Sequence, residues 1–428
     1  KPDSFVIPFL FSSFTGAYYA VPPAVIEPHQ AWEYKRYLMI GDGDVGSIRN
    51  ELYEIRDVKT ASFSGEVRDS VTGATIDHGM VHIYDNLKRP YSQVDISGDG
   101  RFVANLPHGD YYWLVTGHGR DPFPAQGERF TDFNKISIVV ETDADGDTTR
   151  KDAFKRIRVP STGLYNVQVR DTEGNVLPAK VTFVSQYQLP ERCTDCERLE
   201  LDCDLECAPR SYLFEFSLGE HRLPTDLNWN DRQDGEYIEE VAYTQDGQAH
   251  GNIRPGTYDV YVSRGLEYDL AIERGVVVKG GERADISLVL NRSVNTQDYV
   301  SADLHLHSAG SLDSSMSLDK RILSSVAEGL EVAVSTDHNF IVDYEPTIAN
   351  LGLQDWIKSI VGVEVSTLEM GHFNAFPLDY DVGAASHFPF VEYCYEPRAD
   401  KSNATAFDWV ECKPAQIFDH VRQFQLKN

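Results

Sequence analysis

A strand pattern that recurs roughly one hundred residues further along the chain is the feature that most constrains the fold. Three pairs of segments match in the same order: Val67-Arg68-Asp69 with Val169-Arg170-Asp171, Val81-His82-Ile83 with Val181-Thr182-Phe183, and Leu106-Pro107-His108-Gly109-Asp110-Tyr111 with Ile253-Arg254-Pro255-Gly256-Thr257-Tyr258. Short alternating strands between turn residues are typical of a β-sandwich. The repeat therefore predicts two related sandwich modules, over residues 59–155 and 156–295, the second with an insertion.

The segment before the first module, residues 1–58, contains one helical pattern. Gly41-Asp42-Gly43-Asp44 precedes apolar residues with helical spacing, which are Val45, Ile48, Leu52 and Ile55. Two aspartates would repel a phosphate group, so a phosphate-binding loop is disfavoured and capping of a short helix is the better interpretation.

The last part of the chain, residues 296–428, alternates strands with helices. Apolar residues from Leu318 to Leu330 fall on one helical face after Ser317, a suitable N-cap, and residues 331–335 read as a buried strand. Another amphipathic helix begins at Pro414. This alternation indicates parallel βα units.

Two histidines on the first strand of this region, His305 and His307, point to metal binding. Alternate residues of a strand face the same side, so both rings can reach one ion. One such pair is a weak signal in a chain with 13 histidines. Further donors strengthen it: Asp313, His338, Glu364 and His372 follow, several of them at strand ends.

The composition bounds the partners. A formal net charge of -28 argues against nucleic acid and against anionic membranes. No apolar run of about 18 residues predicts a membrane-spanning helix, so membrane insertion is not expected, whereas self-association stays open. The chain begins with Lys1, which is consistent with the removal of a leader.

The six cysteines fall in two groups, which are Cys193, Cys196, Cys203 and Cys207, and then Cys394 and Cys412. Disulfides are favoured over a structural zinc site, because the spacing of the first group fits no standard zinc motif. The pairing of the cysteines remains open. Two glycosylation-type triplets, at Asn291 and Asn403, are also compatible with secretion. We therefore expect a secreted or cell-surface protein.

An acidic turn lies near the end of the first module. Asp143, Asp145 and Asp147 place carboxylates at every second residue, as a calcium loop would. The glutamate that closes an EF-hand loop is missing, so a solvated turn is favoured over a calcium site.

The sequence resembles the PHP superfamily of metal-dependent hydrolases, named for polymerases and histidinol phosphatases, and in particular its carbaryl-hydrolase-like branch. The matching segments are Ala302-Asp303-Leu304-His305-Leu306-His307-Ser308, Ser335-Thr336-Asp337-His338-Asn339, Val361-Gly362-Val363-Glu364 and Gly371-His372-Phe373-Asn374-Ala375-Phe376-Pro377. The modules ahead of them resemble immunoglobulin-like and carboxypeptidase-regulatory-like accessory domains. The resemblance implies a distorted (β/α)7 barrel, incomplete at residue 428, with two or three Zn, Mn or Fe ions.

Carried over residue by residue, the resemblance implies a ligand set. His305 and His307 would bind a first metal, Glu364 would bridge to a second that His372 completes in part, and Asp313 and His338 would serve a third. Asp303, Asp337 and Asn339 would orient the histidines from the outer shell.

The function that follows from this resemblance is metal-dependent hydrolysis of a small molecule. A phosphoester is the first expectation and an amide or carbamate ester the alternative, with a metal-activated water as the attacking group. A non-catalytic structural protein of the surface, or of a filament, with a degenerate domain of this type is the rival from a different class. Metal content separates the two.

Overall fold

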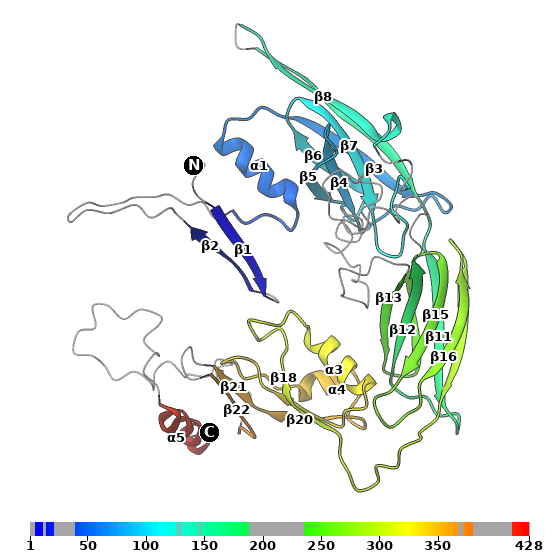
Figure 1. Cartoon of the computed structure of the whole chain (residues 1–428), viewed down its shortest axis with the longest axis vertical. Helices are drawn as coiled ribbons and strands as arrows, with labels where there is room; N and C mark the ends of the chain where they lie inside the picture. Colours follow the sequence, from blue (N-terminus) through cyan, green and yellow to red (C-terminus); the bar gives the residue numbers. More distant parts are fainter. Residues whose placement is uncertain are drawn as a thin grey trace, which may run out of the picture.

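The computed structural model of the chain describes residues 5–11, 14–20, 39–125, 128, 130–144, 147–187, 235–366, 371–379 and 413–427. Two strands near the N-terminus, β1 (Phe5–Phe11) and β2 (Phe14–Ala20), pair as an antiparallel hairpin. In Figure 1 the first sandwich, the second sandwich and the α/β region follow one another along an arc.

The first sandwich packs a three-stranded sheet, in the order β10-β3-β6, against a five-stranded sheet, in the order β5-β4-β7-β8-β9. Its strands are β3 (Ala61–Asp69), β4 (Met80–Asp85), β5 (Pro90–Asp95), β6 (Arg101–Leu106), β7 (Gly109–Thr116), β8 (Lys135–Thr142), β9 (Thr148–Lys151) and β10 (Ala153–Val159), with a 3-10 turn at Asp132–Asn134 before β8. Strand β3 alternates buried with half-buried residues along its whole length. Its buried face contributes Phe63 and Val67 to the core, as the period of two requires.

The second sandwich repeats this plan with sheets in the order β14-β11-β17 and β13-β12-β15-β16. Its strands are β11 (Gly163–Asp171), β12 (Ala179–Tyr187), β13 (Gly235–Thr244), β14 (Gln248–Ile253), β15 (Gly256–Ser263), β16 (Ala271–Val278) and β17 (Arg283–Leu290). Strand β11 pairs antiparallel with β14 and parallel with β17, just as β3 pairs antiparallel with β6 and parallel with β10. The two predicted sandwiches are therefore present and related.

Matched side chains confirm the repeat at the level of single bonds. The hydroxyl of Tyr111 donates to the carbonyl of Pro107, and that of Tyr258 donates to the carbonyl of Arg254, four residues upstream in both cases. This arrangement ties the start of a strand to the preceding corner, as in the tyrosine corner of immunoglobulin-like sandwiches.

The predicted N-terminal helix is α1 (Val45–Ile55), which begins where Asp44 accepts a hydrogen bond from the backbone N–H of Ser47. The helix lies on β5, where the hydroxyls of Tyr53 and Tyr91 are 2.9 Å apart and the guanidinium of Arg49 lies 3.9 Å from the Tyr91 ring centroid. A polar and aromatic face, rather than the apolar stripe, thus attaches α1 to the first sandwich.

A buried ion pair ties the link between the two sandwiches to the first one. Asp69, at the end of β3, accepts hydrogen bonds from the guanidinium of Arg120 and from the hydroxyl of Ser161, both at 2.6 Å. Arg120 also donates to the carbonyl of Pro160, which belongs to the short link between β10 and β11. The link that leads to the second sandwich is therefore tied to the first sandwich.

A second buried arginine joins the second sandwich to the α/β region. Arg264, just after β15, donates to the carbonyls of Pro178 and Val326 and lies with its guanidinium carbon 4.6 Å from the centroid of the Trp356 ring. Val326 belongs to the helix α3 (Leu318–Ala327), so this contact fixes the position of that helix.

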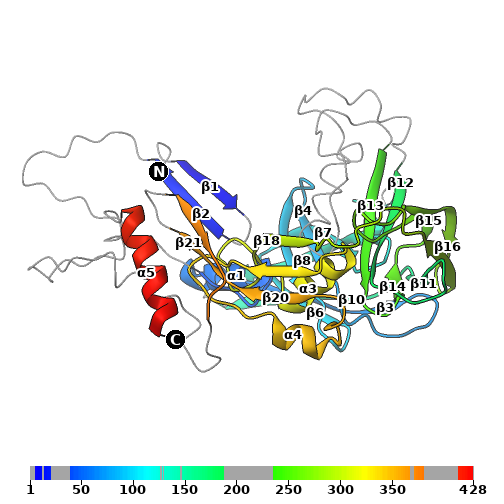
Figure 2. The same cartoon turned by 90° about the horizontal axis from the view of Figure 1, so that it is seen from below.

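The α/β region has a parallel sheet in the order β18-β19-β20, built from β18 (Ala302–Leu306), β19 (Val332–Ser335) and β20 (Lys358–Val361). Helix α3 is capped by Ser317 as predicted, and α4 (Glu345–Asn350) leads to β20. Strands β21 (Val363–Ser366) and β22 (His372–Ala375) form a separate antiparallel pair, beside which α5 (Pro414–Lys427) lies in both views (Figures 1 and 2). Phe373 and Phe418 make an edge-to-face contact there.

This open arrangement differs from the barrel that the resemblance implied. The described part of residues 296–428 forms a three-stranded parallel sheet and an antiparallel pair, without a closed barrel. Parallel strands followed by helices give the same sequence pattern in open sheets and in barrels, which is why the pattern misled. All six cysteines, and the triplet at Asn403, lie outside the described residues. None of the described helices is long and apolar enough to span a membrane.

Candidate metal centre

The end of β18 supplies the two histidines that the sequence singled out. His305 and His307 point to the same side, and their Nε2 atoms lie 3.1 Å apart. The side chain of His305 is 52% exposed and that of His307 is 17% exposed, so the pair sits at the edge of the domain. Asp303 stabilises this strand end by accepting a hydrogen bond from the backbone N–H of His305.

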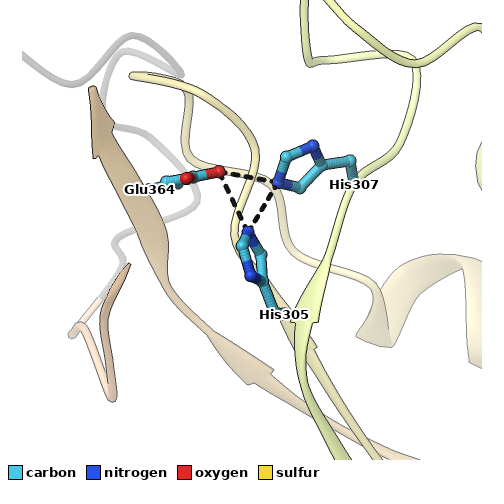
Figure 3. A group of neighbouring side chains, drawn as sticks. All are labelled: His305, His307 and Glu364. Carbon is cyan, nitrogen blue, oxygen red and sulfur yellow. Dashed lines mark hydrogen bonds and ion pairs between the residues drawn. The ribbon is translucent and has the colours of Figure 1, made fainter. Parts of the chain in front are cut away.

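Glu364, on β21, points toward both His305 and His307 (Figure 3). One carboxylate oxygen, Oε2, is 2.8 Å from Nε2 of His307 and 3.1 Å from Nε2 of His305. The other, Oε1, is 2.8 Å from Nδ1 of His372. The residue is only 3% exposed, so its charge has lost most of its water and needs cationic partners.

Asp313 and His338 complete the cluster: Asp313 faces Nδ1 of His307, and His338 contacts both Asp313 and Glu364. Asp313 oxygens lie 2.9 and 3.1 Å from Nδ1 of His307 and 3.2 Å from Nε2 of His338. The hydroxyl of Ser311 donates to Asp313 at 2.7 Å, which fixes the orientation of the carboxylate.

The structure thus brings all six predicted ligand residues together. Three overlapping groups have donor atoms within 4.8 Å of one another: His305 with His307 and Glu364, His307 with Asp313 and His338, and His338 with Glu364 and His372. Imidazole nitrogens and carboxylate oxygens in this number suit divalent ions such as Zn, Mn or Fe better than Ca, which takes oxygen ligands.

The electrostatics of the carboxylates agree with a site for cations. Burial raises the pKa of Asp313, but hydrogen bonds from Ser311 and His307 outweigh it and lower the pKa to about 2. Burial likewise opposes ionisation of Glu364, and the hydrogen bond from His305 with the nearby imidazoles holds the pKa of Glu364 below its ordinary value. Both groups are therefore anionic at neutral pH, the state that binds metal.

The predicted outer-shell residues hydrogen-bond to backbone groups and to a serine hydroxyl rather than to the imidazole rings. Asp337 accepts hydrogen bonds from the backbone N–H and the hydroxyl of Ser308, and Asn339 pairs with the backbone of Ser366. Asp303, as described above, bonds to a backbone N–H. Among the described residues, none of these three side chains bonds to an imidazole, so they position the segments that carry the histidines instead.

Two residues near the centre escaped the sequence prediction. Arg321, on α3, donates from Nε to the carbonyl of His307 at 2.7 Å, and Ser366 places its hydroxyl against Nδ1 of His338. Serine and arginine are common at surfaces and neither stands in a recognisable motif, so the sequence holds no signal for them.

The acidic turn between β8 and β9 is described only in part. Asp143 accepts a hydrogen bond from the backbone N–H of Asp147 at 2.8 Å, so one of its carboxylate oxygens stabilises the turn itself. Asp145 lies outside the described residues. A calcium site there stays a prediction.

Comparison with known proteins finds similar solved structures but no matching family. No family model matches the chain, and no curated protein matches it. Solved structures do: the shaft pilin SpaA of Lactobacillus rhamnosus GG, with 12% identity and a TM-score of 0.27, over 55% of this chain and 99% of that one; and GBS52, the minor pilin of Streptococcus agalactiae. The TIE protein of Bacillus anthracis is similar with 13% identity and a TM-score of 0.20, and the match spans about a third of its length, 34%.

The resemblance to the PHP superfamily is therefore wrong. No family model matches the chain, and the described residues form no barrel. The expected hydrolysis of phosphoesters, amides or carbamates, and the assignment as an enzyme, fall with it. Short histidine and acidic motifs at strand ends describe a metal-ligand set, which many unrelated folds can assemble. The expected secreted or cell-surface location agrees with the pilins among these structures.

Proposed function

We propose that this chain is a structural protein of the cell surface whose α/β region binds divalent transition-metal ions. The observation that supports it most directly is the buried carboxylate of Glu364, which has imidazole nitrogens of His305, His307 and His372 within 3.1 Å. A carboxylate that is this buried costs several kcal/mol in solvation unless cations compensate it. A bound divalent ion supplies that compensation without requiring protons on the histidines.

The serial sandwiches support the structural part of the proposal. Two related modules precede the metal region, and the buried pair of Asp69 and Arg120 ties the link between them to the first module. The similar solved structures named above include a shaft pilin and a minor pilin. The ester or amide substrate expected earlier has no place in this function, whereas self-association remains a prediction.

Metal titration of the full chain tests the proposal. After removal of metal with a chelator and dialysis, we expect Zn²⁺ or Mn²⁺ to bind in a stoichiometric amount by elemental analysis and calorimetry. Binding should raise the thermal midpoint, because an ion at about 100 times its Kd stabilises the folded state by about 2.7 kcal/mol.

Variants locate the site. Glu364→Gln keeps the size of the side chain but removes its charge, so the affinity should fall by more than the roughly 10–100-fold that is typical of outer-shell changes. His250→Ala, at an exposed position of β14, is the matched control and should bind as the wild type does. A wild-type chain that takes up no ion, or a Glu364→Gln chain with unchanged affinity, overturns the proposal.

A further inference from the structure

The hydroxyl of Ser366 contacts two groups of the metal centre. It lies against Nδ1 of His338 and 3.2 Å from the backbone carbonyl of Glu364. A carbonyl can only accept, and a serine hydroxyl has one proton to donate. When the hydroxyl donates to the Glu364 carbonyl, it must accept from His338, and Nδ1 therefore carries a hydrogen.

A second neighbour of the same ring nitrogen favours the same assignment. Oε2 of Glu364 lies 3.3 Å from Nδ1 of His338, and a carboxylate that is ionised can only accept. An unprotonated Nδ1 would present its lone pair to this negative charge, and it would have no donor in a hydroxyl that donates to the Glu364 carbonyl. Both contacts of Nδ1 are satisfied when the hydrogen is on Nδ1, and Nε2 then turns its lone pair toward Asp313, as a nitrogen that shares a cation with this carboxylate would.

The position of Ser366 is fixed by Asn339. The side chain of Asn339 donates to the carbonyl of Ser366 at 3.1 Å and accepts from its backbone N–H at 2.9 Å, as a neighbouring strand would. Its own backbone N–H donates to the carbonyl of Glu364. Asn339 has φ of 51°, a left-handed conformation that asparagine tolerates better than most residues. The loop that carries His338 and the strand that carries Ser366 therefore cannot slide past each other.

We infer that Ser366 is a positioning residue that keeps the hydrogen of His338 on Nδ1 and so makes Nε2 its metal-binding atom. This inference rests on the metal binding proposed above. Nε2 of His338 faces Asp313 at 3.2 Å, so His338 serves the side of the centre formed with Asp313. His338 then does not bind an ion through Nδ1 together with Glu364 and His372. Among the described residues, that group keeps Glu364 and His372 as its two donors.

The tautomer can be measured before any metal is added. The full chain, labelled with ¹⁵N in its histidines and freed of metal, is studied by long-range ¹H–¹⁵N correlation at about pH 8.5, where ordinary histidines are neutral. His338→Gln identifies the signals of His338. We expect the pattern of a neutral ring protonated at Nδ1 in the wild type. Ser366→Thr, which keeps the hydroxyl, should preserve it, and Ser366→Ala should shift it toward Nε2–H, because Asp313 then offers the stronger acceptor.

Metal binding gives the second readout. Ser366→Ala should weaken the ion on the Asp313 side by about 10–100-fold, Ser366→Thr should restore it, and Ser287→Ala, at an exposed site of β17, should leave it unchanged. A wild-type ring protonated at Nε2, or a Ser366→Ala chain with the wild-type tautomer and affinity, overturns the inference. A chain that binds no ion contradicts the proposed function instead, while the metal-free spectrum still decides the tautomer.

Discussion

At the scale of single residues, Asp69 shows how one carboxylate can fix the link between two modules. Its oxygens accept hydrogen bonds from the Ser161 hydroxyl, the Arg120 guanidinium and two backbone N–H groups, those of Val71 and Thr72. Burial raises the pKa of Asp69, but these hydrogen bonds outweigh it and hold the pKa far below the ordinary range. The ionised form is thus the one that the folded protein stabilises.

The sign of the pH dependence follows. A carboxylate with a lowered folded pKa stabilises the protein above its unfolded pKa of about 3.9, and this stabilisation is lost as the pH falls toward the folded pKa. Asp69→Asn should lower the free energy of unfolding by about 3 kcal/mol at pH 7, since it leaves Arg120 buried without a counter-charge. The difference from the wild type should shrink at about pH 3.

Urea denaturation at both pH values measures this difference. Asp285→Asn, an exposed carboxylate on β17, is the control and should change stability by no more than about 0.5 kcal/mol. An Asp69→Asn chain that is as stable as the wild type at neutral pH would show that the link does not depend on this charge.

Residue roles were also where prediction from sequence was least complete. The six donor residues could be named because histidine and acidic side chains at strand ends carry a chemical signal. The partners that orient them could not: Ser366 and Arg321 act through a hydroxyl and a guanidinium that bond to a ring or a carbonyl 14 to 28 positions away. Such contacts depend on how loops fold back, which local patterns do not encode.

At the scale of elements, the helix α1 illustrates a conflict between propensity and packing. Gly46 is buried against β5, where an added Cβ would lie 2.4 Å from Cγ1 of Val94. Gly46 is the second residue of α1, and replacing a helical glycine with alanine stabilises an isolated helix by at most about 1 kcal/mol. Forcing a methyl group into a packed contact costs about 1–3 kcal/mol, so packing should win.

We therefore expect Gly46→Ala to lower the thermal midpoint and to loosen α1 from the first sandwich. Hydrogen exchange of the amides of α1 measures the second effect directly. Glu51→Ala, on the exposed side of the same helix, raises helix propensity without the clash and should leave exchange unchanged or slower. Slower exchange in Gly46→Ala would mean that α1 is held by its own propensity.

Elements were the level best predicted from the sequence. Ser317 and Asp44 cap the helices that the apolar spacing indicated, and β19 falls within the predicted strand over residues 331–335. The sequence did not predict that β10 and β17 pair with the first strand of each sandwich, because local sequence patterns do not indicate a parallel partner far along the chain. The barrel was overpredicted from the same alternation of strands and helices that an open sheet produces.

At the scale of the whole molecule, Arg264 fixes the metal-binding region to the second sandwich. The residue is only 7% exposed. Its guanidinium donates to carbonyls on both sides of the junction and lies close to the ring of Trp356. Arg264→Met keeps much of the apolar stem but removes the hydrogen bonds from the guanidinium to those carbonyls, a loss of about 1–3 kcal/mol.

Limited proteolysis of the intact chain tests this junction. Arg264→Met should speed cleavage in the exposed segment 291–300 between β17 and β18 by several fold, since a weakened contact opens more often. Arg283→Met, an exposed arginine on β17, is the control. Equal cleavage rates in both variants would place the rigidity of the junction elsewhere.

The parallel pairing of the first and last strands in each sandwich has a mechanical consequence. Because β3 runs parallel to β10, and β11 parallel to β17, the chain enters each module at one end and leaves it at the other. Tension along the chain would then pull the paired strands past each other lengthwise. All seven residue pairs of the first ladder and all eight of the second would resist at once, instead of opening one by one from an end.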